Sequence, residues 1–251
     1  QIADDITFKL NRAVVYIDLE LSAKQVEKRY SNNYENHYIF SNNFYRVEID
    51  PDAEMPDNVK FDEFLMDQIE ATLLKVDAKI LIVDNITYFR DDQERAKDAL
   101  KMMKQLKALK KKHGLSILIL AHTPKRDKSK PISRNDIAGS SMIVNFADAA
   151  FGIGESSQGE DVRYIKQVKP SRYSSTVYDA SNVITCKIIN DYNFTKFDVV
   201  GYDCELFHLK DNDTEKRQSD IIAMKNQGKS FREIGNNVGL SHTQVANIYK
   251  K

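Results

Sequence analysis

Four polar side chains follow three short apolar runs of this sequence, each at the point where a run ends. The segments that contain them are Val14–Glu20, Ile80–Asn85 and Ser116–His122, and the polar residues are Glu20, Asp84, Asn85 and His122. Carboxylates can hold a hard cation or accept a proton from water, and an imidazole can donate a hydrogen bond. This set of residue types suits the binding of a magnesium–nucleotide complex.

The elements that must position these side chains are strands. Continuous Val/Ile/Leu runs separated by helical patterns are typical of parallel strands buried on both faces. Crossover connections place the carboxyl ends of such strands at one edge, where open α/β sheets bind ligands. We therefore expect an α/β fold with a mainly parallel sheet. Helices are expected over 1–9, Ser22–Tyr30, Phe61–Val76, Gln93–Lys112 and 135–145, and strands over 13–19, 115–121, Ala149–Gly154 and, at an edge, 44–49.

Later runs alternate apolar and polar residues, which predicts antiparallel hairpins that extend the sheet. These runs are 162–168, 183–189, 196–200 and 204–209. The charged segment 210–216 is the expected linker between a domain over 1–209 and a domain over 217–251. Cys186 and Cys204 have no metal-binding spacing, so we expect reduced packing residues, as in a cytoplasmic protein. No apolar run reaches the ~18–20 residues of a membrane span.

Each candidate residue also has a plainer interpretation. Asp84 could cap the helix that follows its strand, and His122 could be a structural histidine. Glu20 strengthens the catalytic interpretation, because a carboxylate at a neighbouring strand end could polarise the attacking water. The sequence contains no Gly-rich loop ending in Gly-Lys-Ser or Gly-Lys-Thr. We expect that this chain is a fragment that begins just after such a phosphate loop.

The C-terminal residues form a modestly basic module. Residues 215–251 contain seven Lys or Arg and three acids, in a chain with 37 of each class. Ser219–Asn226 is amphipathic, Ser230–Glu233 has the pattern of a capping box, and Gly239-Leu240-Ser241 predicts a turn before a third helix. This order resembles the helix-turn-helix of resolvases and many regulators. A three-helix protein-interaction module is the alternative.

The residues expected to read duplex DNA lie on the last of these helices, pointing away from its core. Gln and Asn can bind adenine in the major groove, and Lys can reach phosphate. These residues are His242, Thr243, Gln244, Asn247 and Lys250.

Several segments together resemble RecA-fold ATPases, in particular the replicative hexameric helicases of the DnaB type and the RepA-like plasmid ATPases. Tyr16–Gln25 is similar to their Glu-containing strand motif, Ile80–Asn85 to their magnesium-binding strand, and Leu120–Arg126 to the sensor strand and following loop of the RepA-like branch. Ile137–Ser141 with Ala147-Asp148 resembles the helix after their central DNA-facing loop. The likeness covers about residues 1–209.

The resemblance implies ATP and Mg²⁺ as cofactors and assigns a role to each candidate. It makes Glu20 the catalytic base, Asp84 the magnesium residue, acting through water and contacting nucleotide with Asn85, and His122 the γ-phosphate sensor. Val168–Tyr173 resembles the basic strand end that reaches a neighbouring subunit's nucleotide; a solvated basic turn is the alternative. The helicases have one residue between Lys and Arg where this chain has two, so Arg172 is preferred to Lys169 as the residue acting in trans.

A basic loop follows the third strand. In a ring it would face the central channel and contact single-stranded DNA without sequence preference, since it has no aromatic residue to stack on bases. An ordinary mobile surface loop is the alternative. Its bases are Lys125, Arg126, Lys128, Lys130 and Arg134.

Two hypotheses follow. The first is a DNA-dependent ATPase with a C-terminal helix-turn-helix. It would be a helicase-like or DNA-remodelling motor of a plasmid or mobile element that forms a homo-oligomeric ring, such as a hexamer. The second is a DNA-binding regulator whose RecA-like body senses nucleotide without motor activity. Strand displacement from a forked duplex distinguishes the two.

Overall fold

The computed structural model describes most of the chain, in two compact units. The described residues are 1–50, 55–86, 95–123, 125–136, 141–171, 175–210 and 214–249, with the side chains at 95–99, 141–143 and 214–216 left out. The first unit comprises 1–124, 137–146 and 190–196, and the second comprises 125–136, 147–189 and 197–251. This division differs from the predicted domain boundaries, which remain a prediction.

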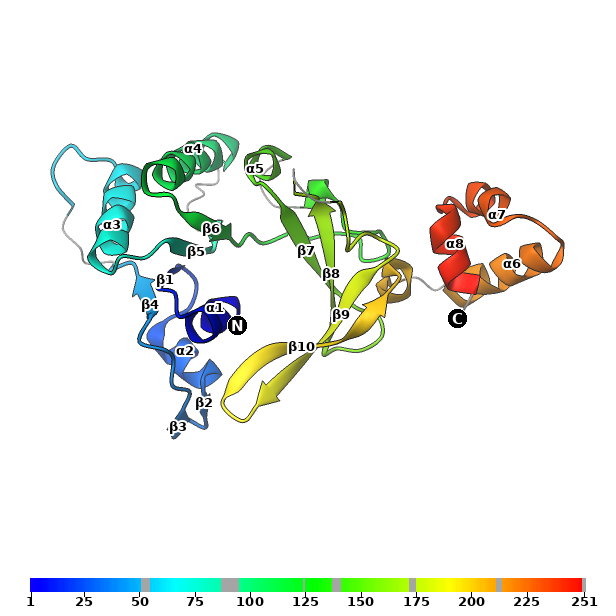
Figure 1. The fold of residues 1–251 in the computed structure, drawn as a ribbon, viewed down its shortest axis with the longest axis horizontal. Coiled ribbons are helices and arrows are strands. Elements are labelled where there is room, and N and C mark those ends of the chain that lie inside the picture. Colours follow the sequence, from blue (N-terminus) through cyan, green and yellow to red (C-terminus); the bar gives the residue numbers. More distant parts are fainter. Residues whose placement is uncertain are drawn as a thin grey trace. The chain divides into compact units, whose positions relative to one another are not determined.

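A four-stranded parallel sheet forms the first unit (Figure 1). Its order is β4-β1-β5-β6, and all three ladders are parallel. The predicted apolar runs became strands, and the predicted edge strand lies at the edge as β4. The bounds are Val14–Asp18 for β1, Phe44–Glu48 for β4, Ile80–Asp84 for β5 and Ser116–Ile119 for β6.

Apolar side chains cover both faces of this sheet, as the continuous Val/Ile/Leu runs require. On one face Val15, Ile17, Leu81 and Val83 pack against the helices α3 and α4. On the other face Val14 and Ile82 pack with Ala3 of α1. The helices are α1 (Ile2–Leu10), α2 (Ala23–Arg29), α3 (Phe61–Lys75), α4 (Arg95–His113) and α5 (Ser141–Phe146).

The segment between α2 and β4 carries an aromatic cluster with a short hairpin, β2 (Ser31–Asn32) with β3 (Asn36–His37). The ring of Phe40 stacks on Phe44 at 4.8 Å, and the ring of Tyr38 lies 4.4 Å from that of Phe194. Phe44 in turn lies 5.8 Å from Tyr16 of β1. The long excursion before β4 is therefore packed onto the sheet by aromatic rings.

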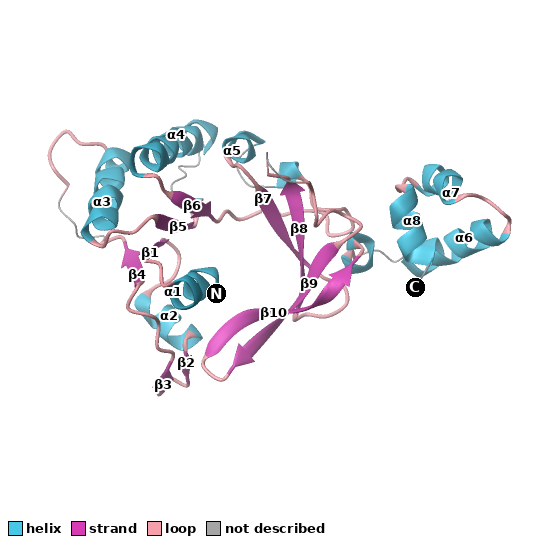
Figure 2. Ribbon diagram, viewed as in Figure 1, coloured by secondary structure: helices cyan, strands magenta, loops and turns pink. Residues whose placement is uncertain are grey.

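A separate antiparallel sheet has the order β10-β9-β8-β7 (Figure 2). It belongs to the second unit except for the end of the β9–β10 hairpin, residues 190–196, which is part of the first. The prediction that these hairpins extend the parallel sheet is wrong, because alternation predicts a strand but not the sheet it joins. The prediction of a strand over 204–209 is also wrong, since a 3₁₀ helix, η3 (Glu205–His208), occupies that position. The strands are β7 (Ala150–Glu155), β8 (Val162–Lys169), β9 (Val183–Asp191) and β10 (Phe194–Asp203).

The expected helix over 135–145 is described only in part. Residues 134–136 form a 3₁₀ turn, η2 (Arg134–Asp136), and α5 begins at Ser141; residues 137–140 lie outside the described ranges.

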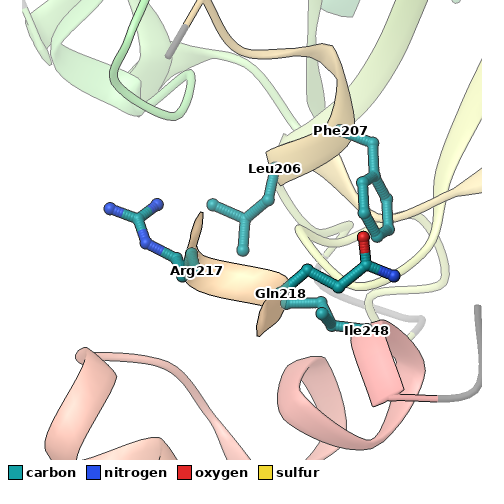
Figure 3. A pocket seen from close by; sticks show the side chains of 5 residues that line it. All are labelled: Leu206, Phe207, Arg217, Gln218 and Ile248. Atoms are coloured by element: carbon teal, nitrogen blue, oxygen red, sulfur yellow. The ribbon is translucent and has the colours of Figure 1, made fainter. Parts of the chain in front are cut away.

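Three helices complete the second unit: α6 (Thr214–Asn226), α7 (Phe231–Val238) and α8 (His242–Tyr249). They share one apolar cluster with the antiparallel sheet, to which Ile221, Ile234, Val245 and Ile248 contribute. A cavity of about 10 Å³ remains between η3, α6 and α8 (Figure 3). It has room for about one water molecule, so this junction is a packed core rather than a ligand site.

The two cysteines, Cys186 and Cys204, are free and buried, as expected of packing residues. Within the described ranges, no helix combines the length and the apolar character that crossing a membrane requires.

Candidate functional site

The carboxyl ends of β1, β5 and β6 lie side by side because the register pairs Asp18 with Asp84 and Val83 with Ile119. Backbone hydrogen bonds continue this pairing past the strands. Leu19 N donates to Asp84 O at 2.7 Å, and Ile86 N donates to Leu120 O at 3.0 Å. The polar residues that follow the three strands are therefore held at one rim of the sheet.

Glu20, Asn85 and His122 make a triangle of contacts at this rim. The Nδ2 group of Asn85 donates to Glu20 Oε2 at 2.8 Å and lies 2.9 Å from His122 Nε2. The distance from His122 Nε2 to Glu20 Oε2 is 3.4 Å. The predicted convergence of these three side chains is what the structure shows.

The burial of the three side chains differs. Asn85 is only 6% exposed, whereas the side chains of Glu20 and His122 are 46% and 62% exposed. A carboxamide Nδ2 is a donor, so His122 Nε2 accepts its hydrogen bond, and the imidazole proton of this tautomer is on Nδ1. Asn85 thus anchors two solvent-accessible groups that are free to meet a ligand.

Asp84 lies beside this triangle, with its carboxylate bonded to Tyr16. The Tyr16 hydroxyl donates to Asp84 Oδ2. Burial raises the pKa of the Asp84 carboxyl, and the charges of Glu20 and Asp18 raise it further, while the hydrogen bond from Tyr16 opposes the increase. Burial and the bond to Asp84 also raise the pKa of Tyr16 well above its usual range.

These electrostatics fit a divalent cation at Asp84. An acidic group whose pKa is raised by burial and by other carboxylates gains from a nearby positive charge. Mg²⁺ binds through one or two carboxylates together with waters and substrate phosphates. In the part of the chain that the structure describes, no three His, Cys, Asp or Glu side chains are grouped so that they could hold a metal ion by themselves.

The sequence interpretation missed Tyr16, whose hydroxyl is the partner of Asp84. An alternation inside β1 is the signal that could have found it. Val14, Tyr16 and Asp18 occupy every second position, so they share the face opposite to Val15 and Ile17. Because the parallel register pairs Asp18 with Asp84, Tyr16 and Asp18 lie on the same face of the sheet as Asp84.

Of the two residues predicted to act in trans, only Lys169 is described. It ends β8 in the second unit, and its Nζ donates to Ala147 O at 2.6 Å. Arg172 lies outside the described residues. The role of both residues stays a prediction.

The basic loop is anchored to the second unit, and most of its cations have partners there. Lys128 pairs with Glu155, and Arg134 Nε donates to Val168 O at 3.0 Å. Arg126 bonds the carbonyl of Lys130, whose own Nζ lies 3.5 Å from Asp127. Lys125 is exposed. The loop therefore offers fewer unpaired charges than its sequence predicts.

The base of this loop is fixed by a buried ion pair. Glu205 of η3 is 1% exposed; its Oε1 accepts from Ile132 N at 2.6 Å, and its Oε2 accepts from Lys166 Nζ at 2.6 Å. Lys166 also donates to Ile132 O at 2.8 Å. The ion pair thus binds Ile132 twice, with Glu205 accepting from its N–H and Lys166 donating to its carbonyl.

The last helices have the predicted caps. Ser230 and Glu233 form a capping box at the start of α7, and Gly239 ends it with a left-handed φ of 71°. Gln244 Oε1 accepts from Ser241 N at 2.9 Å, which completes the start of α8. A Cβ at Gly235 would lie 2.4 Å from Leu240 O, so the turn packs directly on the backbone of α7.

The expectation that the DNA-reading side chains all point away from the core is wrong for Asn247. Its Nδ2 donates to Ser181 O at 3.3 Å, in the loop before β9. His242 and Thr243 are exposed, Gln244 is partly buried, and Lys250 lies outside the described residues. The exposed start of α8 is thus the part of this helix that is open to a partner.

Comparison with known proteins agrees with the fold of the first unit. A search of the curated proteins gave no match. Residues 4–128 match a family model described as an AAA domain. This range contains Glu20, Asp84, Asn85 and His122. The match supports an AAA or RecA-like ATPase domain over residues 4–128.

Proposed function

We propose that this protein is a DNA-dependent ATPase, a ring-forming helicase-like or DNA-remodelling motor of a plasmid or mobile element. ATP and water would give ADP and phosphate at the rim formed by β1, β5 and β6. The observation that carries the proposal is the contact of Glu20 and His122 with the buried amide of Asn85, next to the carboxylate of Asp84. Base, cation ligand and phosphate sensor are thereby within reach of one another.

Each residue has a role that its geometry allows. Glu20, 46% exposed, would accept the proton of the attacking water at its carboxylate. Asp84 would hold Mg²⁺ through water, and the ion would supply charge stabilisation for the phosphates. His122 would donate from Nδ1, since Nε2 is bonded to Asn85 in this state.

These 251 residues contain no Gly-rich loop ending in Gly-Lys-Ser or Gly-Lys-Thr, so other groups would have to hold the phosphates. Arg172, with Lys169, would complete the site of a neighbouring subunit in a homo-oligomer, as an arginine that stabilises transition-state charge. The basic loop would contact the backbone of single-stranded DNA, and α7 with α8 would dock on duplex DNA as a helix-turn-helix.

One observation favours the second candidate function, a DNA-binding regulator without motor activity. Lys128 and Arg134 of the basic loop already have partners within the second unit. Glu155 offsets the charge of Lys128, and the bond to Val168 O occupies one donor of Arg134, so both side chains offer less to phosphate contacts. A regulator needs only the C-terminal helices for DNA and a body that binds nucleotide.

The experiment that tests the proposal measures ATP hydrolysis by the complete gene product with and without single-stranded DNA, and strand displacement from a forked duplex. If the protein is a motor, single-stranded DNA should stimulate ATP hydrolysis, and strand displacement should stop when ATP is withheld. Hydrolysis without displacement favours the regulator. The absence of nucleotide binding and hydrolysis contradicts both.

A further inference from the structure

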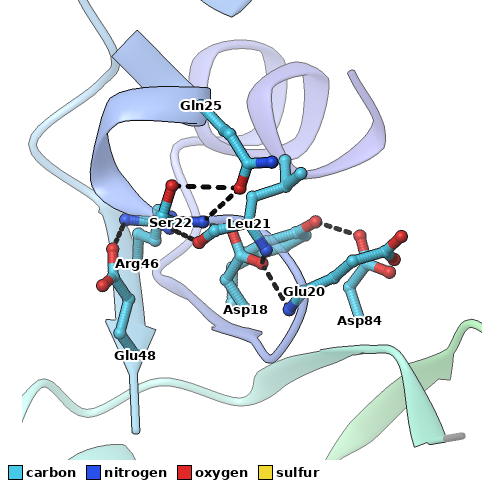
Figure 4. A network of polar contacts seen from close by, with 9 residues as sticks. Asp18, Glu20, Leu21, Ser22, Gln25, Arg46, Glu48 and Asp84 are labelled. Carbon is cyan, nitrogen blue, oxygen red and sulfur yellow. Dashed lines mark hydrogen bonds and ion pairs between the residues drawn. The ribbon is translucent and has the colours of Figure 1, made fainter. Parts of the chain in front are cut away.

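Asp18 is the third acid near the rim, and both of its oxygens are occupied by the protein itself. Its Oδ1 accepts from Leu21 N at 2.9 Å and from Glu20 N at 3.2 Å, and its Oδ2 accepts from Arg46 Nε at 2.8 Å (Figure 4). The side chain is 2% exposed. Asp18 therefore fixes the backbone of Glu20 and Leu21, after β1, and is not available to a ligand.

Arg46 reaches this segment from β4, at the edge of the sheet. Its Nε bonds Asp18, and its Nη2 donates to Leu21 O at 2.7 Å. Its Nη1 contacts the exposed Glu48. One guanidinium thus binds the carboxylate that holds the Glu20 and Leu21 amides and also binds the Leu21 carbonyl, which a planar fork of donors can do simultaneously.

We propose that Arg46 is a positioning residue that sets the place of Glu20 at the rim, acting through Asp18 and through the Leu21 carbonyl. This inference rests on the proposed function, in which Glu20 is the base. The Glu20 side chain is half exposed, so its backbone must be fixed from within the sheet if the carboxylate is to meet a water reproducibly. A displacement of 1 Å in such a group can cost about 10²-fold in rate.

The neighbouring contacts indicate that Asp18 and Arg46 act on Glu20 and Leu21 and not on the rest of the chain around them. After Leu21 the chain is held independently by the capping box of Ser22 and Gln25 at the start of α2. Before it, Leu19 N is bonded to Asp84 O. Between these two fixed points, Asp18 accepts from the Glu20 and Leu21 amides and Arg46 donates to the Leu21 carbonyl. Loss of Arg46 should therefore loosen Glu20 while leaving α2 and β5 in place.

The experiment compares Arg46→Met and Arg46→Lys with the control Glu48→Gln, in the complete gene product. Glu48→Gln changes only the exposed partner of Arg46 and leaves the contacts to Asp18 and Leu21 intact. Two quantities are measured: amide hydrogen exchange at residues 19–22 and at β5, and kcat and KM for ATP. Exchange at β5 reports whether each variant is folded.

If Arg46 positions Glu20, Arg46→Met should speed amide exchange at Glu20 and Leu21 by about tenfold. That factor corresponds roughly to the free energy of one hydrogen bond. The same variant should lower kcat by about 10²-fold with KM unchanged. Arg46→Lys should recover part of both, since its ammonium can pair with Asp18 but lacks the separate nitrogens, Nε and Nη2, with which Arg46 reaches Asp18 and the Leu21 carbonyl. Glu48→Gln should match the wild type in both.

Three results would overturn the proposal: unchanged exchange at 19–22, a kcat unaffected by Arg46→Met, or exchange that rises equally at β5 and at 19–22. A separate result would show that the protein does not hydrolyse ATP with Glu20 as the base. In that case Glu20→Gln leaves turnover intact, or no turnover exists, while the exchange measurement still decides whether Arg46 fixes the segment.

Discussion

Asn85 donates a hydrogen bond to Glu20 across the ends of two neighbouring strands, at 2.8 Å. The donor is buried and the acceptor is half exposed. A group of this kind can hold a carboxylate in one place while leaving its second oxygen open to solvent. The bond links the residue directly after β5 to the second residue after β1, and it depends on the parallel register of those strands.

The first prediction concerns that bond. Asn85→Asp replaces the donor with a carboxylate next to Glu20 and Asp84, so repulsion among the acids should displace Glu20. We expect kcat for ATP to fall by 10–100-fold, about 1.4–2.7 kcal/mol. Asn85→Ala, which removes the donor without adding charge, should lose less. Equal kcat values for wild type and Asn85→Asp would show that the bond has no part in turnover.

A second prediction follows from the contact between Tyr16 and Asp84. The hydrogen bond from Tyr16 lowers the pKa of Asp84 against the effects of burial, so Tyr16→Phe should raise that pKa. Because the ionised carboxylate is the form that holds Mg²⁺, the acid limb of the pH–rate profile should move to higher pH. Tyr38→Phe is the matched control, since Tyr38 bonds Asp4 at 2.8 Å instead. A shift to lower pH in Tyr16→Phe would contradict this account.

The third prediction concerns stability in the second unit. Lys166→Met leaves the buried carboxylate of Glu205 without its cation, which should lower the free energy of unfolding by about 3 kcal/mol. Lys128→Met removes an exposed ion pair with Glu155 and should cost less than about 1 kcal/mol. Denaturant unfolding measures both. Equal costs would show that the Glu205 pair does not anchor the basic loop.

A fourth prediction addresses DNA binding by α8. Gln244→Ala should weaken duplex binding by about 1–3 kcal/mol and relax base preference if this helix enters the major groove. Asn247→Ala should have a smaller effect, because the donor group of Asn247, Nδ2, is bonded to Ser181 O, whereas the bond of Gln244 to Ser241 N uses only the acceptor Oε1. Competition binding against sites of altered sequence measures both the affinity for duplex DNA and the base preference of each variant. Unchanged binding in Gln244→Ala and in Thr243→Ala would identify the C-terminal helices as a protein-interaction module.

The parallel strands of the first unit and their shared rim could be predicted from sequence, because short continuous apolar runs between helices are typical of strands buried on both faces. Glu20, Asn85 and His122 were placed together on that argument, and their contacts agree. Arg46 could not be found in the same way. It lies on an edge strand that follows an aromatic, irregular segment, and its partner Asp18 comes from a strand distant in sequence.

The second unit was harder to predict, for two physical reasons. Alternation in β7–β10 specifies strands with two different faces, but it does not specify which sheet they join. A helix periodicity likewise does not say which polar side chain finds a partner in another element. Asn247 is such a case, since its acceptor lies in the loop before β9.

The measurement that tests the central claim most directly compares wild type, Glu20→Gln and Glu27→Gln in the complete gene product. Glu27 is a matched control: its side chain is 45% exposed and pairs with His37, much as Glu20, 46% exposed, lies beside His122. ATP binding and single-turnover hydrolysis are measured side by side. The account predicts that Glu20→Gln binds ATP like the wild type and does not hydrolyse it, while Glu27→Gln does both. Wild-type hydrolysis by Glu20→Gln would contradict the account.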